Sequence, residues 1–374
     1  MWRDAVAKGL EQAQPGEQVQ VIAADGTPVG RGLADPGSPI GVRMWTRGRK
    51  VIDEALWSAR IERAAGLRER LAPPRTNALR LLHGEGDRMP GFVVDRYGSV
   101  AVVRTDGEAA GARLSDLVRA ISPIAESWGL STIVHRVAAR DGAESKRGAP
   151  ELRVLRGDAA PRVVRVEEHG VPFVVDVAHG QKTGAFLDQR DNRRRVGELA
   201  RGRRVLNLFS YAGGFSLHAA LGGAAEVTSV DVAAAAHATA QESFRAAGVE
   251  TAKHPFVTAD VRTFLDAARG RGQSWDLVVS DPPSFAPNEK AVARALSAYR
   301  GLHRACAQVL APGGILCAAS CSSHVDAGAF LTTLDDAALD GVDLRLVELR
   351  GAGFDHPTLP AFPEGRYLKF AVLA

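Results

Sequence analysis

The chain has 374 residues, of which 45% are hydrophobic, 24% are charged and only 6% are aromatic. This composition is typical of a globular protein and excludes a disordered chain, a collagen and a coiled-coil rod. With 47 Lys and Arg against 43 Asp and Glu, the net charge of +4 allows a polyanionic partner without requiring one. At about 100–200 residues per domain, the length predicts two or three domains.

The chain contains no run of roughly 18 apolar residues, so we predict no membrane segment. The N-terminal residues lack the basic-then-apolar pattern of a signal peptide, which favours a soluble, cytoplasmic protein. Its three cysteines are Cys306, Cys317 and Cys321. They form neither a disulfide framework nor a CxxC metal site, so we predict no metal.

Short strands with turn signals between them fill the first fifty residues, at 18–22, 28–32 and 40–45. This pattern predicts a small β domain over residues 1–50. Apolar side chains at helical spacing then predict an amphipathic linker helix within 51–74, closed by Pro73 and Pro74. Strands and one helical stretch, 112–128, predict a small α+β middle domain over 75–165.

A hairpin over 162–177 precedes the largest predicted domain, residues 166–374. Short apolar runs at 205–209, 226–230, 276–280 and 314–319 are typical of buried parallel strands. Alanine-rich helices are predicted between them, at 233–247 and 291–310. The alternation predicts a doubly wound α/β fold with a mostly parallel sheet. In such sheets ligands bind beyond the carboxyl ends of the strands.

Three features beyond the first strands indicate an adenosine-bearing cofactor. A glycine-containing turn, 210–215, follows the first strand and opens a helix, although a tight turn without a ligand is about as frequent. Asp231 ends the second strand, where a carboxylate can accept both ribose hydroxyls or simply cap a helix. Asp260 lies at the third strand end, where it can accept an adenine amine.

The fourth and fifth strands end in residues suited to chemistry on a base. Asp281 is followed by Pro282 and Pro283, which fix the backbone and remove two amide donors, so the carboxylate offers a rigid acceptor to a planar base. Cys321 follows the fifth strand and therefore faces the predicted crevice. Cys306 falls in a helix and Cys317 within a strand, where packing is the expected role.

Together these motifs resemble the bacterial 23S ribosomal RNA cytosine-5 methyltransferases that carry an N-terminal PUA domain. The likeness rests on 209–215, 229–231, 281–285 and 320–322, and also on 84–91, 179–190, 355–357 and 363–369, so it covers nearly the whole chain. It implies a class I (Rossmann-like) S-adenosylmethionine-dependent methyltransferase fold, with an N-terminally shortened PUA-like domain.

The resemblance also implies roles for individual residues. Cys321 matches the family's nucleophile and Asp281 its base-holding carboxylate. The implied cofactor-binding residues are Gln189, Phe209, Ser210, Tyr211, Gly213, Asp231, Asp260 and Asp281. The implied partners are S-adenosyl-L-methionine and 23S rRNA, and the sequence is compatible with a homodimer.

Methylation of cytosine carbon 5 requires activation of the ring, which a thiolate achieves by adding to carbon 6. We expect Cys321 to form this adduct while Asp281, ionised or protonated, binds ring nitrogen 3. The arginine-rich run 190–204 predicts one exposed helix face, either an RNA contact or a merely solvated surface. Lys182, Arg190 and Arg193 are the predicted contacts to the RNA backbone.

Two alternatives remain open from the residues. An amino-directed RNA methyltransferase could use Asp281, Pro282 and Pro283 without any thiol. A non-catalytic RNA-binding module with a vestigial methyltransferase fold is the second alternative. A third candidate, a nicotinamide-dependent dehydrogenase, ranks last because the glycine turn lacks the GxGxxG spacing of dinucleotide-binding enzymes.

Overall fold

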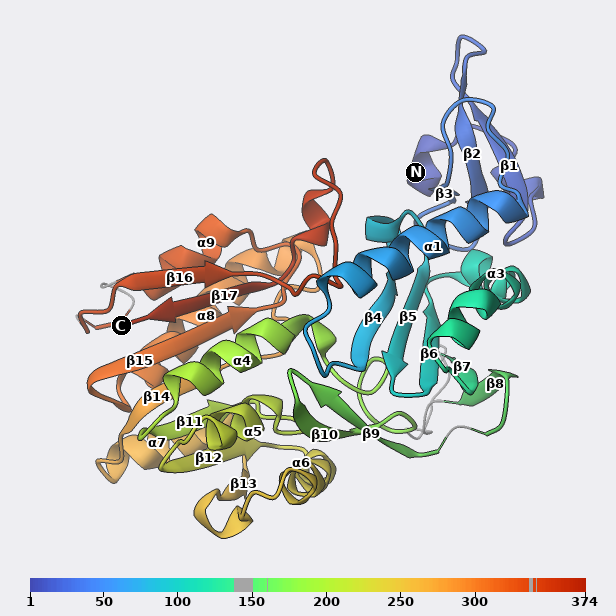
Figure 1. Ribbon diagram of the computed structural model, residues 1–374. Coiled ribbons are helices and arrows are strands. Elements are labelled where there is room, and N and C mark those ends of the chain that lie inside the picture. The colour runs from blue at the N-terminus through green and yellow to red at the C-terminus, as the bar shows by residue number, and fades with distance from the viewer. Residues whose placement is uncertain (138–150, 160, 336–338, 341) are drawn as a thin grey trace. The chain divides into compact units, whose positions relative to one another are not determined.

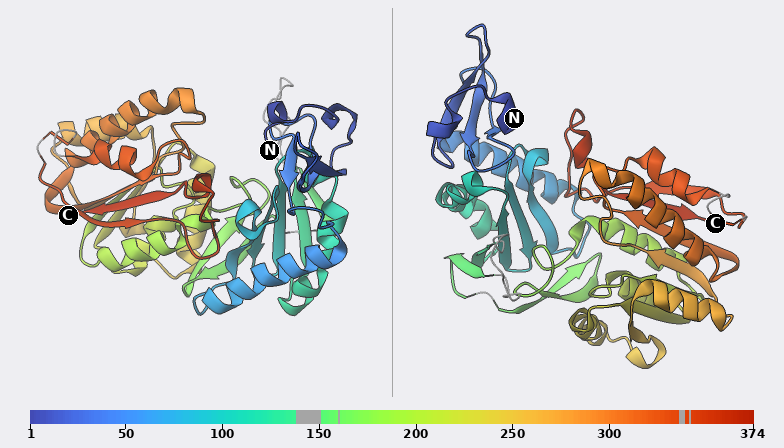
Figure 2. Two further views of the ribbon diagram at one scale, coloured as in Figure 1. Left: turned by 90° about the horizontal axis from the view of Figure 1, so that it is seen from above. Right: turned by 180° about the vertical axis from the view of Figure 1, so that it is seen from behind.

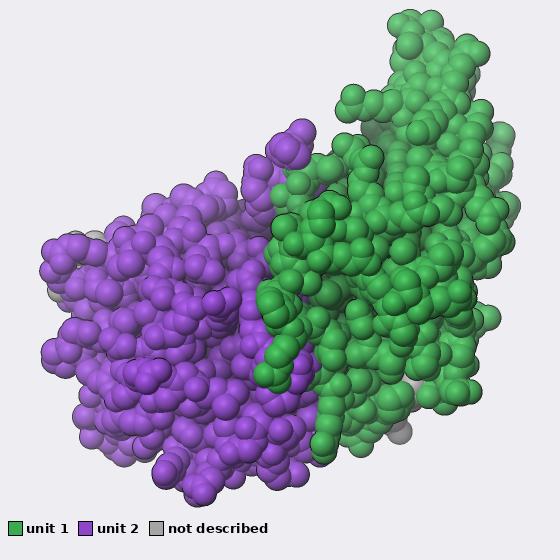
Figure 3. Space-filling view, viewed as in Figure 1, with its two compact units in different colours: residues 1–166, 176–185, 354–359 green, residues 167–175, 186–353, 360–374 purple. Residues whose placement is uncertain are grey.

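The computed structural model describes residues 1–137, 151–159, 161–335, 339–340 and 342–374. The chain divides into two compact units, coloured separately in Figure 3. Unit 1 comprises 1–166, 176–185 and 354–359, and unit 2 comprises 167–175, 186–353 and 360–374. The three predicted N-terminal segments thus form one unit. Two short segments of the predicted 166–374 domain also belong to unit 1, which differs from the predicted scheme.

Unit 1 contains two separate sheets (Figure 1). The first is antiparallel in the order β1-β2-β3, and the second has the order β4-β5-β6-β7-β8, with β6 and β7 parallel. Its strands are β1 Gln18–Ile22, β2 Pro28–Ala34, β3 Val42–Met44, β4 Ala78–His83, β5 Phe92–Tyr97, β6 Val100–Thr105, β7 Thr132–Arg136 and β8 Leu152–Arg156. Its helices are α1 Glu54–Leu71, α2 Glu108–Gly111 and α3 Leu114–Ser127.

The predicted linker helix is part of the core of unit 1. Asp53 caps α1 by accepting a hydrogen bond from the Leu56 backbone N–H. Trp57 on α1 packs against Trp45 and Phe92, with ring centroids 4.5 Å and 5.4 Å away. Trp45 follows β3 and Phe92 begins β5, so one apolar cluster joins the N-terminal β domain, the helix and the middle domain. This shared core is why the three predicted segments form one unit.

Buried polar contacts attach the two late segments to unit 1. Thr183 donates a hydrogen bond to the Asp95 carboxylate, and Asp355 accepts one of 2.8 Å from the Arg80 backbone N–H. Arg68, which is fully buried, binds both oxygens of Asp87 and also donates to the Asp355 carbonyl. The motifs at 84–91 and 355–357 therefore have a structural role here, because a buried guanidinium requires such partners.

The predicted hairpin is present as β9 (Val163–Glu168) and β10 (Val171–Asp176), which form a two-stranded sheet. Unit 2 holds a seven-stranded sheet in the order β13-β12-β11-β14-β15-β17-β16 (Figures 1 and 2). Its strands are β11 Arg204–Leu208, β12 Glu226–Asp231, β13 Phe256–Thr258, β14 Trp275–Ser280, β15 Leu310–Ser320, β16 Leu346–Arg350 and β17 Lys369–Leu373. Its helices are α4 Arg190–Leu199, α5 Gly214–Leu221, α6 Ala234–Ala246, α7 Val261–Gly270, α8 Val292–Ala307 and α9 Ala327–Leu331.

The sheet of unit 2 is covered on both faces, as the doubly wound prediction requires. Val196 of α4 and Phe215 of α5 pack on one face, and Leu265 of α7 and Leu302 of α8 belong to the other apolar cluster. The strands from β11 to β15 are parallel, while β17 runs antiparallel to both of its neighbours, β15 and β16. The last two strands were not predicted from the sequence.

Candidate active site

Asp231 joins the turns that follow the first two strands of the unit 2 sheet. One of its carboxylate oxygens accepts a 2.8 Å hydrogen bond from the Tyr211 backbone N–H, and the other accepts one of 2.8 Å from Ala233. Because β11 and β12 are parallel neighbours, their carboxyl ends lie at the same edge. A carboxylate with two such bonds keeps lone pairs on both oxygens, so Asp231 can still accept hydroxyl groups.

The turn after β11 has an unusual backbone. Phe209, Tyr211 and Gly213 all have positive φ, of 56°, 47° and 72°. Such conformations are uncommon for residues other than glycine and occur where the surrounding structure enforces them, often at ligand sites. A Cβ atom on Gly213 would lie 2.7 Å from the Cβ of Ala240 on α6, so this position requires glycine.

Asp260 has the structural role that competed with ligand binding in the sequence. It caps α7, and its carboxylate accepts a 2.9 Å hydrogen bond from the Thr263 backbone N–H. This hydrogen bond holds the pKa of Asp260 below its usual value. Asp260 is exposed, and Val232, which directly follows Asp231, is 67% exposed. The edge beyond β12 and β13 therefore presents both an acceptor and an apolar surface.

Asp281, at the end of β14, lies in an environment that favours its protonated form. Burial and the neighbouring Asp188 carboxylate raise the pKa of Asp281 to about 7, against the hydrogen bond of 3.0 Å from Gln189 Nε2. Asp188 accepts a 2.7 Å hydrogen bond from the Tyr367 hydroxyl at one oxygen. Its other oxygen is buried and has no hydrogen-bond partner within the part of the chain that the structure describes.

A chain of side chains fixes the orientation of Gln189. Its carbonyl oxygen accepts a 2.6 Å hydrogen bond from Asn192, whose own oxygen accepts one of 3.2 Å from Arg350. Asn192 also donates to the Gly351 carbonyl. Since Asn192 can only accept from Arg350 through its oxygen, the amide orientations along this chain are mutually determined. The Gln189 N–H is thereby directed at Asp281.

Cys321 follows β15, next to the end of β14. Its thiol lies 4.0 Å from the Pro282 carbonyl oxygen and is partly exposed. Cys306 and Cys317 are fully buried, and burial raises the pKa of each thiol to about 12. The predicted packing of these two cysteines is confirmed, and Cys321 is the cysteine that solvent and ligands can reach.

Hydrogen bonds between the ends of β14 and β15 hold the backbone around Cys321. The buried Tyr299 hydroxyl donates to Ser320 Oγ at 2.9 Å and lies 3.0 Å from Ser322 Oγ. Ser322 Oγ also lies 3.1 Å from Ser284 Oγ. Lys369, which begins β17, donates to the carbonyl oxygens of Ser322 and Tyr367, both at 2.7 Å. The turns that carry Asp281 and Cys321 are thus connected on both sides of the cysteine.

The comparison with protein-family models places this site in a known class. Residues 80–364 match the model of S-adenosylmethionine-dependent methyltransferases, and residues 1–47 match that of a PUA-like domain. The chain belongs to the S-adenosylmethionine-dependent methyltransferase family. Its fold is the class I methyltransferase fold with an N-terminal PUA-like domain, as the resemblance predicted.

Curated relatives of this methyltransferase match it over nearly its whole length. The ribosomal RNA large subunit methyltransferase of Deinococcus radiodurans is 38% identical, covering 100% of this chain and 92% of the relative. Ribosomal RNA large subunit methyltransferase I of Photobacterium profundum is 37% identical, with 95% and 89% covered. Among solved structures, that of SMU.776 complexed with SAH has the same fold, with a TM-score of 0.85, 23% identity, and 96% and 92% coverage.

The strand-end residues fit the cofactor of this methyltransferase family, S-adenosyl-L-methionine. The cofactor carries a cationic sulfonium and an ammonium group. Asp231 and Asp281 lie at the ends of strands that end at one edge of the sheet. Asp188, one of whose buried oxygens has no hydrogen-bond partner among the described residues, acts on Asp281, and a cationic ligand would compensate these carboxylates. Within the described residues, no group of three His, Cys, Asp or Glu side chains is arranged to hold a metal ion. No helix among them is long and apolar enough to cross a membrane.

The exposure predicted for two arginines of the methyltransferase is wrong. Arg190 is fully buried and Arg193 is 8% exposed, because both surround the buried carboxylate of Glu168. Arg193 binds both Glu168 oxygens at 2.8 Å and 2.6 Å and also donates to the Phe186 carbonyl. Arg190 lies 3.9 Å from Glu168. The charge run could not reveal this pairing, since Glu168 lies in a separate hairpin.

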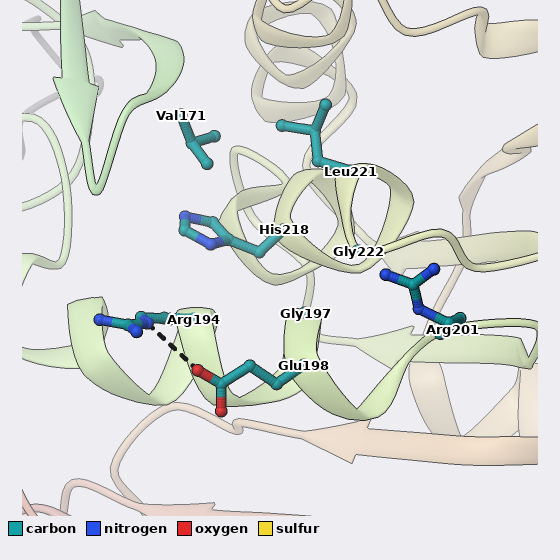
Figure 4. A pocket seen from close by; sticks show the side chains of 8 residues that line it. All are labelled: Val171, Arg194, Gly197, Glu198, Arg201, His218, Leu221 and Gly222. Carbon is teal, nitrogen blue, oxygen red and sulfur yellow. Dashed lines mark hydrogen bonds and ion pairs between the residues drawn. The ribbon is translucent and has the colours of Figure 1, made fainter. Parts of the chain in front are cut away.

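Lys182 is exposed, and so are three arginines of the run, Arg194, Arg201 and Arg204, whereas Arg195 and Arg203 are half-buried. Lys182 lies in unit 1, and Arg194 and Arg201 lie in unit 2. Arg194 and Arg201 line a pocket of about 270 Å³ together with His218 and Leu221 (Figure 4). This pocket lies at the C-terminal end of α5, whereas the active-site turns adjoin its N-terminal end. The pocket is therefore separate from the carboxylate and thiol site.

Sequence reasoning did not assign roles to several residues that complete the site. Asp188, Tyr367 and Lys369 lie within the motifs that carried the resemblance, but no role was inferred for them. Lys369 had a detectable signal: it is a single lysine at the start of the apolar run 370–373. For Tyr299, in the middle of α8, no signal in the sequence predicts a contact with the turn at Ser320.

Proposed function

We propose that this enzyme transfers a methyl group to carbon 5 of a cytosine in 23S ribosomal RNA through a covalent Cys321 adduct. The observation that carries the proposal is the position of Cys321 beside the Asp281 turn, with its thiol 4.0 Å from the Pro282 carbonyl. The names of the curated relatives support large-subunit ribosomal RNA as the substrate.

The reaction needs a nucleophile and a group that stabilises the charge that develops on the cytosine ring. The Cys321 thiolate adds to carbon 6, and the electron pair of the carbon 5–carbon 6 double bond becomes available at carbon 5. With a pKa of about 7, Asp281 can hold a proton near neutral pH and donate a hydrogen bond to ring nitrogen 3. S-adenosylmethionine, when bound, supplies the electrophilic methyl group. A base then removes the carbon 5 proton, and the carbon 6–sulfur bond breaks to release Cys321.

The chain offers a consistent set of residues for the cofactor. We assign the ribose to Asp231, the adenine side to Asp260 and the exposed Val232, and the methionine end to the turn from Phe209 to Gly213. Gln189, Ser210, Tyr211 and Asp281 complete this set. The two free acceptor positions on Asp231 and the strained backbone of the turn support the assignment.

For the RNA backbone we propose the exposed cations. Lys182 keeps the role predicted from the sequence, because it is exposed. Arg190 and Arg193 are occupied by Glu168, so Arg194 and Arg201 replace them as candidates. Replacement of Arg201 by Gln should weaken RNA binding and reduce its dependence on salt, since each phosphate contact contributes to the salt slope. An unchanged slope would exclude Arg201 from the RNA contact.

The decisive experiment compares wild type with Cys321→Ala on ribosomal RNA fragments, with the product mapped by mass spectrometry. We expect loss of 5-methylcytosine in the variant while S-adenosylmethionine binding, measured by calorimetry, is retained. Retained binding shows that unit 2 is folded. Near-normal product from Cys321→Ala would refute the covalent scheme. A methyl group mapped to the exocyclic nitrogen would instead favour the amino-directed alternative.

A further inference from the structure

Lys369 is a buried cation whose ammonium group is bound by two backbone carbonyls. Its side chain is 4% exposed, and its ammonium group donates to the carbonyl oxygens of Ser322 and Tyr367. Among the residues that the structure describes, Lys369 forms no ion pair with a carboxylate. A buried ammonium group normally has such a partner, because its removal from water is unfavourable.

The geometry places this cation beside Cys321. Lys369 and Ser320 are directly opposite each other in the antiparallel pair of β15 and β17. The Lys369 ammonium group donates to the Ser322 carbonyl, so the register partner of Lys369, Ser320, and its hydrogen-bond partner, Ser322, flank the cysteine in the sequence. The two groups interact electrostatically, because an ionised Cys321 thiol raises the pKa of Lys369.

Among the described residues, Cys321 and Asp326 are the ionisable groups that act on the pKa of Lys369. Burial lowers the pKa of Lys369 to about 8, while Cys321 and Asp326 oppose this shift. Asp326 is already engaged as the cap of α9, where it accepts a 2.7 Å hydrogen bond from Ala329. On the other side, Tyr299 packs against the same turn; burial raises its pKa, and Cys321 and Asp281 raise it further. Cys321 is thus a neighbour of Lys369 whose thiol becomes an anion when it ionises.

We propose that Lys369 is a positioning residue that holds the Ser320–Ser322 turn and stabilises the thiolate form of Cys321. The inference rests on the proposed function, because it explains how the nucleophile is activated before RNA binds. Its mechanism is electrostatic: a nearby opposite charge favours the ionised thiol, and the thiolate is the nucleophilic form. No bond to Lys369 forms or breaks.

The test measures the rate at which iodoacetamide alkylates Cys321 as a function of pH, in the full-length protein without RNA or cofactor. The labelled residue is identified by mass spectrometry. We expect the midpoint for wild type below the ordinary thiol value of about 8.5. Lys369→Met should raise this midpoint by about one pH unit, and Lys369→Arg should keep it near that of wild type. Lys253→Met, which removes an exposed lysine, is the matched control and should change nothing.

The expected size of the effect is modest and specific. A rise of one unit leaves about tenfold less thiolate at pH 7. The higher basicity of that thiolate offsets about threefold, so the alkylation rate should fall roughly threefold. A role confined to holding the turn would slow labelling or methylation without moving the midpoint, and it would not be rescued selectively by Lys369→Arg.

Three results would overturn the inference. One is a wild-type midpoint at or above about 8.5, which is decisive even if Lys369→Met fails to fold. The second is an equal midpoint in wild type and a folded Lys369→Met. The third is a midpoint in Lys369→Arg that follows Lys369→Met. Because alkylation requires no methyl transfer, failure of the proposed carbon 5 reaction is detected separately, by the product of Cys321→Ala.

Discussion

The buried ion-pair cluster at Glu168 allows a sharp prediction for the stability of unit 2. The Glu168 side chain is 1% exposed and binds Arg193 at both oxygens, with Arg190 3.9 Å away and His218 3.3 Å away. Glu168→Ala would leave two buried guanidinium groups facing a site without an anion. Breaking such a pair by removing one partner costs about 3–5 kcal/mol.

Glu198→Ala is the matched control. Glu198 also pairs with two arginines, Arg194 and Arg195, both at 3.1 Å, but its side chain is 47% exposed. Exposed pairs of this kind contribute about 0.2–1 kcal/mol. Glu168→Ala and Glu198→Ala therefore remove the same side chain from two arginine partners each, and the main difference between them is burial.

Thermal unfolding and hydrogen exchange measure the difference. For a domain of 150–250 residues, 1 kcal/mol shifts Tm by about 2–4 °C, so Glu168→Ala should lower the Tm of unit 2 by about 6–20 °C. Peptides from α4, which carries both arginines, should lose protection in hydrogen exchange. Glu198→Ala should shift Tm by less than about 4 °C. Equal shifts for the two variants would refute the argument that burial of the guanidinium groups sets the cost.

The pH dependence of the free energy of unfolding provides a second test of the Glu168 cluster. Although burial opposes it, the Arg193 guanidinium and His218 hold the pKa of Glu168 well below its usual range. A depressed carboxyl pKa contributes stability above the pKa of the unfolded chain, and this contribution is lost as the pH falls. Wild type should therefore lose stability from about pH 5 downward, and Glu168→Gln should lack this component.

Three further predictions concern the candidate site. Gly213→Ala should lower stability and weaken S-adenosylmethionine binding in calorimetry, because the φ of Gly213 is 72° and the new Cβ would lie 2.7 Å from Ala240. The control is Gly248→Ala, at a position with a φ of 71° and no atom within 4 Å of the new Cβ. This control should carry only the backbone cost of about 1–2 kcal/mol and bind the cofactor normally. Burial and Asp188 raise the pKa of Asp281 to about 7, so between about pH 4 and 7 the native state keeps a proton that the unfolded chain releases. Denaturant titrations should therefore show that wild type loses stability relative to Asp281→Asn as the pH rises through this range. Parallel stability curves for the two proteins would contradict the raised pKa. In the native protein one thiol, Cys321, should react with iodoacetamide, and all three should react in denaturant; rapid native labelling of Cys306 or Cys317 would contradict their burial.

The local pattern of the sequence determined the parallel strands of unit 2, the helices between them and the order of its functional positions. Alternating apolar runs and alanine-rich helices predict the doubly wound fold because a parallel strand buried on both faces must be continuously apolar. The topology then requires that Asp231, Asp281 and Cys321 lie at one edge of the sheet, since all parallel strands end there. The resemblance of the motifs to a known family predicted the identity of the cofactor.

Tertiary structure decided which charges are available and which are buried. Arg190 and Arg193 belong to a run that is typical of a solvated helix face. Both are nevertheless buried, because they surround the carboxylate of Glu168, which lies more than twenty residues away in the sequence. Lys369 becomes a neighbour of Cys321 only because β17 inserts antiparallel beside β15. The shared core of Trp45, Trp57 and Phe92 likewise unites segments that appear separate along the chain. Periodicity reports local conformation, whereas the environment of a charge depends on residues that only the fold brings close.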